Sequence, residues 1–181
     1  MVVYFAASWS DSGFSDLLGH YTASRVVCCR CVLLIYNESS KMDVLTVLPP
    51  NFGYVIFVYL YSWIMLTYLG IKVGAARKKF NVKYPTMYSD KEPVFNCIQR
   101  AHQNTLEVYP QWLVFQTIVA LVYPLSASVL GAIWVTSRFS YAWGYYTGDP
   151  AKRMHGAYGY IGYLGVIILS ISVALQLLGI Y

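Results

Sequence analysis

Three long stretches of this chain contain no charged side chain. They cover residues 44–71, 108–137 and 154–181, and only 12% of all residues are charged. A helix that crosses a bilayer needs about 20 consecutive apolar residues, whereas soluble domains carry about 25% charged residues. The pattern therefore predicts a polytopic membrane protein of the all-α class, because such runs satisfy their backbone polar groups in lipid as helices.

The middle stretch is long enough for two helices joined by a turn. Residues 123–126 read Tyr-Pro-Leu-Ser, and a proline in this position is typical of a tight turn. With this division we expect a bundle of four transmembrane helices in a membrane domain that covers residues 42–181. The helices are predicted near residues 52–73, 97–123, 126–147 and 157–180.

The basic residues of the predicted loops indicate the orientation. The first loop contains Arg77, Lys78, Lys79, Lys83 and Lys91, and the third contains Lys152 and Arg153. The second loop is uncharged, so the positive-inside rule places the first and third loops in the cytosol. These basic loop residues, which set the orientation in the membrane, account for the net charge of +5. We expect no nucleic-acid partner, since that would need a soluble basic surface.

Residues 1–41 differ from the rest of the chain. They are rich in serine, and Cys28, Cys29 and Cys31 lie close together without the paired spacing of a zinc site. Met42 is a candidate alternative start. We predict a leader of unknown role that is either disordered or an alternative N-terminus.

A polar stripe is predicted at the start of the second helix. Its members share one face at helical spacing: Arg100, Gln103, Asn104, Glu107 and Gln111. An unpaired charge in lipid costs several kcal/mol, so these side chains must face protein, water or a polar ligand. A purely structural network rarely needs so many ligand-type groups at one end of a bundle.

A second polar face is predicted on the third helix. Arg138, Tyr141 and Tyr145 are spaced i, i+3, i+7. Two such faces can line one cleft that offers cations for carboxylates, a carboxylate for an ammonium group, and amides and hydroxyls for peptide bonds. This set suits a small zwitterionic peptide. For Arg138, a structural ion pair with Glu107 or Asp149 is favoured over direct ligand contact.

Some of these residues have plainer interpretations. Trp143 and Tyr146 fit an interfacial aromatic belt as well as ligand contact. Taken alone, the basic residues 77–79 are more typical of a topology signal than of a binding site.

Three blocks of the chain resemble one membrane-protein family. They cover residues 76–88, 95–110 and 141–153 and follow in the expected order and separation. The central block contains Arg-Ala-His-Gln-Asn-Thr-Leu-Glu-Val-Tyr-Pro, which is similar to a signature of the membrane-associated proteins in eicosanoid and glutathione metabolism. Within that family the blocks are most similar to the type-3 microsomal glutathione S-transferases.

The resemblance implies a homotrimer in the endoplasmic reticulum membrane, with the mitochondrial outer membrane as the alternative location. It implies glutathione as co-substrate, no metal, and membrane lipid together with a lipophilic electrophile or lipid hydroperoxide as further partners. Glutathione would lie between neighbouring subunits near the cytosolic face. By position in the motifs, its binding residues would be Arg77, Arg100, Gln103, Asn104, Glu107 and Tyr141.

The same resemblance implies three catalytic residues. Tyr145 would lie near the sulfur, and Arg153 would hold the glutathione thiol as thiolate. Lys78 stands where leukotriene-C synthase has an arginine proposed to protonate the opening epoxide. A fixed cation favours the thiolate of a thiol whose ordinary pKa is about 8.5. The loop before Arg153 is one residue longer than in that synthase, so Lys152 is the alternative to Arg153.

The implied activities are conjugation of lipophilic electrophiles or epoxides, including leukotriene-C synthesis, and reduction of lipid hydroperoxides. Val108 replaces a tyrosine that contacts glutathione in the family, and Lys78 replaces an arginine. These departures favour general transferase or peroxidase chemistry over leukotriene synthesis. The alternatives are a non-catalytic family member that binds and presents lipid, and a tetraspan scaffold.

Overall fold

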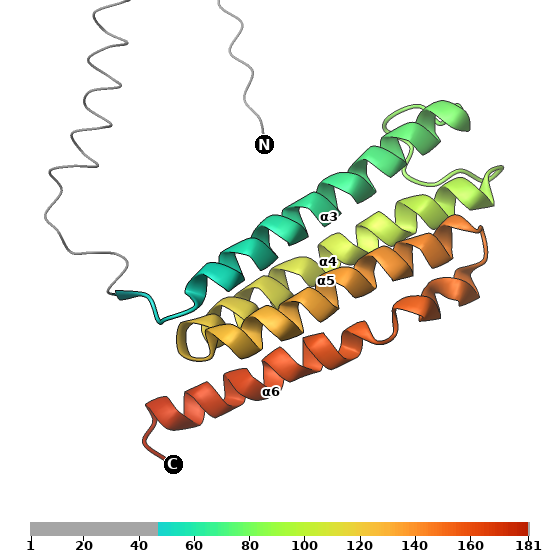
Figure 1. Ribbon diagram of the computed structural model, residues 1–181. Coiled ribbons are helices and arrows are strands. Elements are labelled where there is room, and N and C mark those ends of the chain that lie inside the picture. Colours follow the sequence, from blue (N-terminus) through green and yellow to red (C-terminus); the bar gives the residue numbers. More distant parts are fainter. Residues whose placement is uncertain (1–46, 181) are drawn as a thin grey trace, which may run out of the picture. The chain divides into compact units, whose positions relative to one another are not determined.

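The computed structural model describes residues 47–180, and this part of the chain is helical throughout apart from its connecting loops (Figure 1). The elements are α3 (Phe52–Lys79), α4 (Pro93–Val122), α5 (Pro124–Tyr146), the 3-10 helix η1 (Pro150–Gly156) and α6 (Gly159–Leu177). The predicted all-α class is confirmed for the described residues. The predicted leader, residues 1–41, lies outside them.

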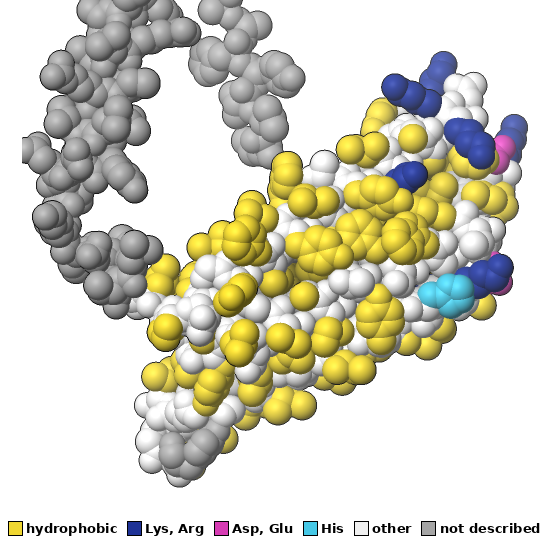
Figure 2. Space-filling view, viewed as in Figure 1, with side chains coloured by type: hydrophobic (Ala, Val, Ile, Leu, Met, Phe, Trp, Pro, Cys, Tyr) yellow, Lys and Arg dark blue, Asp and Glu magenta, His cyan; other side chains and the backbone are white. Residues whose placement is uncertain are grey.

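Three of these helices, α3, α4 and α6, are long and apolar enough to cross a membrane. Large apolar side chains point outward along them, with Phe57 70% and Ile168 65% exposed. Figure 2 shows such side chains over the length of the helices, while lysines and arginines gather where α3 ends and α4 begins. The chain is therefore a membrane protein. Spanning by α5, the cytosolic orientation and the homotrimer stay predictions.

The helix ends differ from the predicted ones for local reasons. Helix α3 continues past residue 73 to Lys79, because basic residues in its last turn complement the negative end of the helix dipole. It stops before Asn81, whose φ of 52° turns the chain. Helices α4 and α5 both begin at a proline, which is favoured in the first turn. The predicted turn therefore shortens to the single residue Tyr123.

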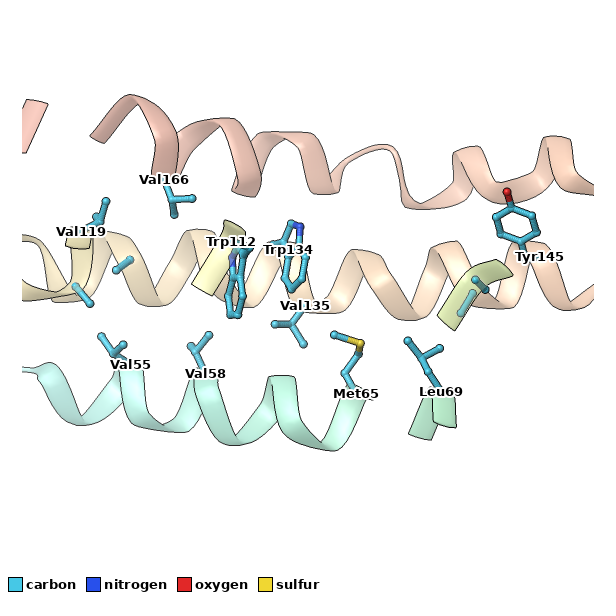
Figure 3. Close-up of a cluster of buried hydrophobic side chains, with 14 of the residues drawn as sticks. Val55, Val58, Met65, Leu69, Trp112, Val119, Trp134, Val135, Tyr145 and Val166 are labelled. Atoms are coloured by element: carbon cyan, nitrogen blue, oxygen red, sulfur yellow. The ribbon is translucent and has the colours of Figure 1, made fainter. Parts of the chain in front are cut away.

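A stacked tryptophan pair lies at the centre of the core (Figure 3). Trp112 of α4 and Trp134 of α5 are fully buried, with ring centroids 4.3 Å apart and planes within 10°. Met65 of α3 and Val166 of α6 belong to the same cluster. The pair fixes how α4 and α5 are rotated about their axes, and thus which of their side chains face the polar end of the subunit.

Glycines bring the last part of the chain close to α5. A Cβ on Gly162 of α6 would lie 2.4 Å from the Leu130 carbonyl oxygen, and a Cβ on Gly144 of α5 would lie 2.1 Å from the Lys152 carbonyl oxygen. Real Cβ atoms do not approach so closely, so both positions need glycine. As a result η1 lies directly against the end of α5.

Candidate functional site

A cleft of about 390 Å³ lies between α4, α5, η1 and the start of α6. Its polar lining consists of Asn104, Gln111, Arg138, Tyr141, Arg153, Tyr160 and Tyr163. Three of these, Asn104, Tyr141 and Arg153, are among the predicted binding and catalytic residues. The predicted meeting of the polar faces of the second and third helices is therefore found in this cleft, although only part of each face takes part.

Arg153 reaches the cleft because η1 is held in a fixed position. The Asp149 carboxylate accepts a hydrogen bond of 2.9 Å from the Ala151 amide at the start of η1. The Lys152 carbonyl then packs on Gly144, and Nη1 of Arg153 lies 3.5 Å from the Tyr145 hydroxyl. Lys152, the alternative predicted from the loop length, is exposed and does not line the cleft.

Tyr145 is buried beneath the cleft and not in its lining. Its side chain is 5% exposed, and Figure 3 shows its hydroxyl pointing from α5 toward η1. The hydrogen bond to Tyr145 raises the pKa of Arg153 above its ordinary value. The ring of Tyr145 also meets Tyr141 edge-on at 5.1 Å. A guanidinium and two phenols therefore form a connected group at this end of the cleft.

The predicted ion pair of Arg138 is wrong. Glu107 instead pairs with Arg100 at 3.0 Å, and Asp149 caps η1. Nη1 of Arg138 donates to Oδ1 of Asn104 at 3.3 Å, so the arginine lines the cleft with a neutral partner. This outcome follows from the rotation of α4, which directs Asn104 toward α5.

The predicted stripe on α4 divides into two groups. Asn104 and Gln111 line the cleft, whereas Arg100, Gln103 and Glu107 do not. The Arg100 and Glu107 side chains are 42% and 45% exposed and bind each other across two helical turns. An exposed pair of this kind contributes little to stability. Both groups therefore remain available to a ligand that carries the opposite charges.

Arg77 and Lys78 lie apart from the cleft. They line a second hollow of about 540 Å³ at the end of α3. Arg77 is only 8% exposed, and Nη1 donates to the Thr86 carbonyl oxygen at 2.7 Å. Its guanidinium also lies over the Tyr84 ring at 4.3 Å. One subunit therefore does not bring Arg77 and Lys78 together with Arg153.

The sequence interpretation missed the contribution of α6. Tyr160 and Tyr163 line the cleft, and the Tyr163 hydroxyl donates to Oε1 of Gln111 at 2.9 Å. Their i, i+3 spacing in an otherwise apolar helix was an available signal. Trp143, considered for ligand contact, is 56% exposed and donates instead to the Tyr68 hydroxyl at 3.1 Å.

Comparison with known proteins gives consistent matches. The family model described as MAPEG family matches residues 55–175. An uncharacterized protein of Synechocystis is 36% identical over 111 residues, which cover 61% of this chain and 77% of that protein. Human microsomal glutathione S-transferase 2 is 30% identical over 104 residues, covering 57% of this chain and 69% of the human protein.

The bovine microsomal glutathione S-transferase 2 is 33% identical over 88 residues, which cover 48% of this chain and 58% of the bovine protein. The similarity to both mammalian proteins is therefore to the second type of microsomal transferase. The predicted likeness to the type-3 branch stays a prediction.

Proposed function

This chain belongs to the MAPEG family, and we propose that it is a membrane transferase that uses glutathione as co-substrate. The relatives named as microsomal glutathione S-transferases support this assignment. The observation that carries it is the position of Arg153, whose cation lines the cleft and whose Nη1 lies 3.5 Å from the Tyr145 hydroxyl. This arrangement suits the activation of a thiol.

Arg153 would stabilise the reacting sulfur as thiolate. A free thiol with a pKa of about 8.5 is mostly protonated at neutral pH, and a nearby cation increases the nucleophilic fraction. The Tyr145 hydroxyl accepts from Arg153 and retains its own proton to donate. It would direct that proton to the sulfur and orient the thiolate.

The other predicted residues would bind the peptide part of glutathione. Arg100 would exchange its partner Glu107 for a glutathione carboxylate, and Glu107 would accept the ammonium group. Asn104 and Tyr141 line the same cleft as Arg153 and would hydrogen-bond the peptide groups, with Gln103 beside them.

Arg77 and Lys78 would come from a neighbouring subunit. Within one chain they line a different hollow from Arg153. We therefore assign the complete glutathione site to the boundary between two subunits of a homotrimer, on the cytosolic side of the endoplasmic reticulum membrane.

Two reactions follow from one activated sulfur. With an epoxide, the carbon–sulfur bond forms as the carbon–oxygen bond breaks, and Lys78 protonates the alkoxide. With a hydroperoxide, the sulfur attacks the terminal oxygen and the oxygen–oxygen bond breaks. This gives glutathione sulfenic acid and an alkoxide, which takes a proton to become the alcohol. A second glutathione then converts the sulfenic acid to glutathione disulfide and water. The lipophilic substrate would enter from the bilayer.

Purified protein in detergent tests this proposal. It is assayed with glutathione and, in parallel, cumene hydroperoxide, a chlorinated aromatic and a leukotriene epoxide, and glutathione binding is measured by calorimetry. Turnover of at least one co-substrate is expected. Absence of glutathione binding contradicts the proposal, and binding without any turnover favours the non-catalytic lipid-presenting alternative.

A further inference from the structure

Arg138 is a cation in the cleft, and it has no anionic partner among residues 47–180. Its one hydrogen bond within the described chain goes to the neutral Asn104 amide, and its buried Nε has no partner there. Among the described residues no aspartate or glutamate lines the cleft. The nearest acid on α4, Glu107, is paired with Arg100.

A cation in this position is costly without further compensation. Charged side chains within membrane helices normally pair with an opposite charge. The guanidinium of Arg138 lies 5.1 Å from the Trp134 ring and 5.3 Å from the Tyr141 ring. Such cation–π contacts contribute about 1 kcal/mol each, which offsets only part of the cost. The geometry therefore favours an anionic ligand.

The depth of Arg138 indicates which ligand supplies the anion. Its Cα precedes that of Tyr145 by seven residues, or about 10 Å along α5, and its guanidinium lies beside Asn104 and the Tyr141 ring. In the proposed function Arg100 binds a glutathione carboxylate, a neighbouring subunit contributes Arg77, and Arg153 stabilises the sulfur. Besides Asn104 and Gln111, the walls of the cleft include Val108, Met154 and the aromatic Tyr160, which give a lipophilic molecule apolar surface to pack against.

We propose that Arg138 binds the carboxylate of the lipophilic co-substrate and so selects acids over neutral molecules of the same shape. A guanidinium is the side chain best matched to a carboxylate, because its planar fork donates two parallel hydrogen bonds. Each Nη carries two hydrogens, so the two Nη groups can supply this fork while Nη1 keeps its bond to Asn104. The inference rests on the proposed function, since it names the second substrate of the same cleft.

Two matched pairs of acid and methyl ester test the inference. Kinetics are measured for a lipid hydroperoxide acid and its methyl ester, and binding is measured by calorimetry for arachidonic acid and methyl arachidonate, which do not react with glutathione. The wild-type protein is compared with Arg138→Gln, Arg138→Lys and the control Lys91→Gln, which removes an exposed loop cation. Thermal unfolding and the elution position in detergent identify variants that fail to fold.

The wild-type protein is expected to prefer the acid at least tenfold in kcat/KM and in Kd. Arg138→Gln removes that preference, Arg138→Lys keeps part of it, and Lys91→Gln keeps all of it. Equal kcat/KM and Kd values for acid and ester in the wild-type protein overturn the inference. A loss of glutathione affinity in Arg138→Gln that matches the loss of acid preference overturns it too. If no hydroperoxide turns over, only the peroxidase reaction of the proposed function fails, and the binding of arachidonic acid still decides the role of Arg138.

Discussion

The Arg153 guanidinium lies 3.5 Å from the Tyr145 hydroxyl, although the two side chains belong to different helices. The contact depends on Gly144, which leaves room for the Lys152 carbonyl and so lets η1 turn back onto α5. Tyr145 thereby gives the exposed Arg153 a hydrogen-bond partner beside the cleft. The proposed activation of glutathione depends on this contact.

Removing the cation tests that activation. Arg153→Gln is expected to lower turnover roughly 100-fold, the loss typical of a preorganised electrostatic contact at a reacting atom. It should also remove the ultraviolet difference absorbance of bound thiolate. Steady-state kinetics and difference spectra measure the two effects.

The matched control is Lys152→Gln. Lys152 carries the same charge one residue earlier but does not line the cleft, so turnover and thiolate absorbance should stay near the wild-type values. If Lys152→Gln gives the larger loss, Lys152 activates the thiol and the role proposed for Arg153 is wrong.

The pH dependence of turnover should reflect ionisation of the glutathione thiol and not of Arg153. The Tyr145 hydroxyl raises the pKa of Arg153 further above the assay range, so the guanidinium stays charged throughout. Bound next to a cation, the thiol ionises at lower pH than in water. In Arg153→Gln the midpoint of the rate against pH should therefore move up, toward about 8.5. An unchanged midpoint would contradict thiolate stabilisation by Arg153.

Much of the fold was predictable from the charge-free stretches, because lipid demands long apolar helices. Pro124 also marked the division between α4 and α5 correctly. The ends of the helices were less predictable. Lys79 remains helical because of favourable dipole interactions at the end of α3. The 3-10 helix depends on contact with Gly144, which no local pattern reveals.

The sequence indicated which polar residues gather at this end of the bundle, but not which of them line the cleft. At about 100° per residue, Asn104 and Gln111 lie toward one edge of the α4 stripe, and Gln103 and Glu107 toward the other. Only the first edge faces the cleft, because the buried Trp112 sets the rotation of α4. That rotation arises from packing between helices, so the sequence alone placed all these residues on one face and paired Arg138 with the wrong partner.

Arg77 is expected to stabilise the loop that follows α3. Its guanidinium donates to the Thr86 carbonyl at 2.7 Å, and a hydrogen bond to a charged group contributes about 1.5–3 kcal/mol. Arg77→Gln should therefore speed tryptic cleavage after the exposed Lys83 about tenfold or more, as followed by mass spectrometry. Lys79→Gln, which removes an exposed cation of the same turn, serves as the control. An unchanged cleavage rate together with weaker glutathione binding would assign Arg77 to the ligand alone.

The close contact of α6 with α5 should make Gly162 sensitive to a single methyl group. In Gly162→Ala the new Cβ would meet the Leu130 carbonyl oxygen at 2.4 Å, and overpacking of this kind costs about 1–3 kcal/mol. Gly53→Ala is the matched control, because a Cβ at Gly53 in α3 meets nothing within 4 Å and alanine favours the helix by about 0.5–1 kcal/mol. Thermal unfolding in detergent should therefore give a lower Tm for Gly162→Ala and an equal or slightly higher Tm for Gly53→Ala. Equal Tm values for the two variants would show that α6 does not pack on the α5 backbone at Leu130.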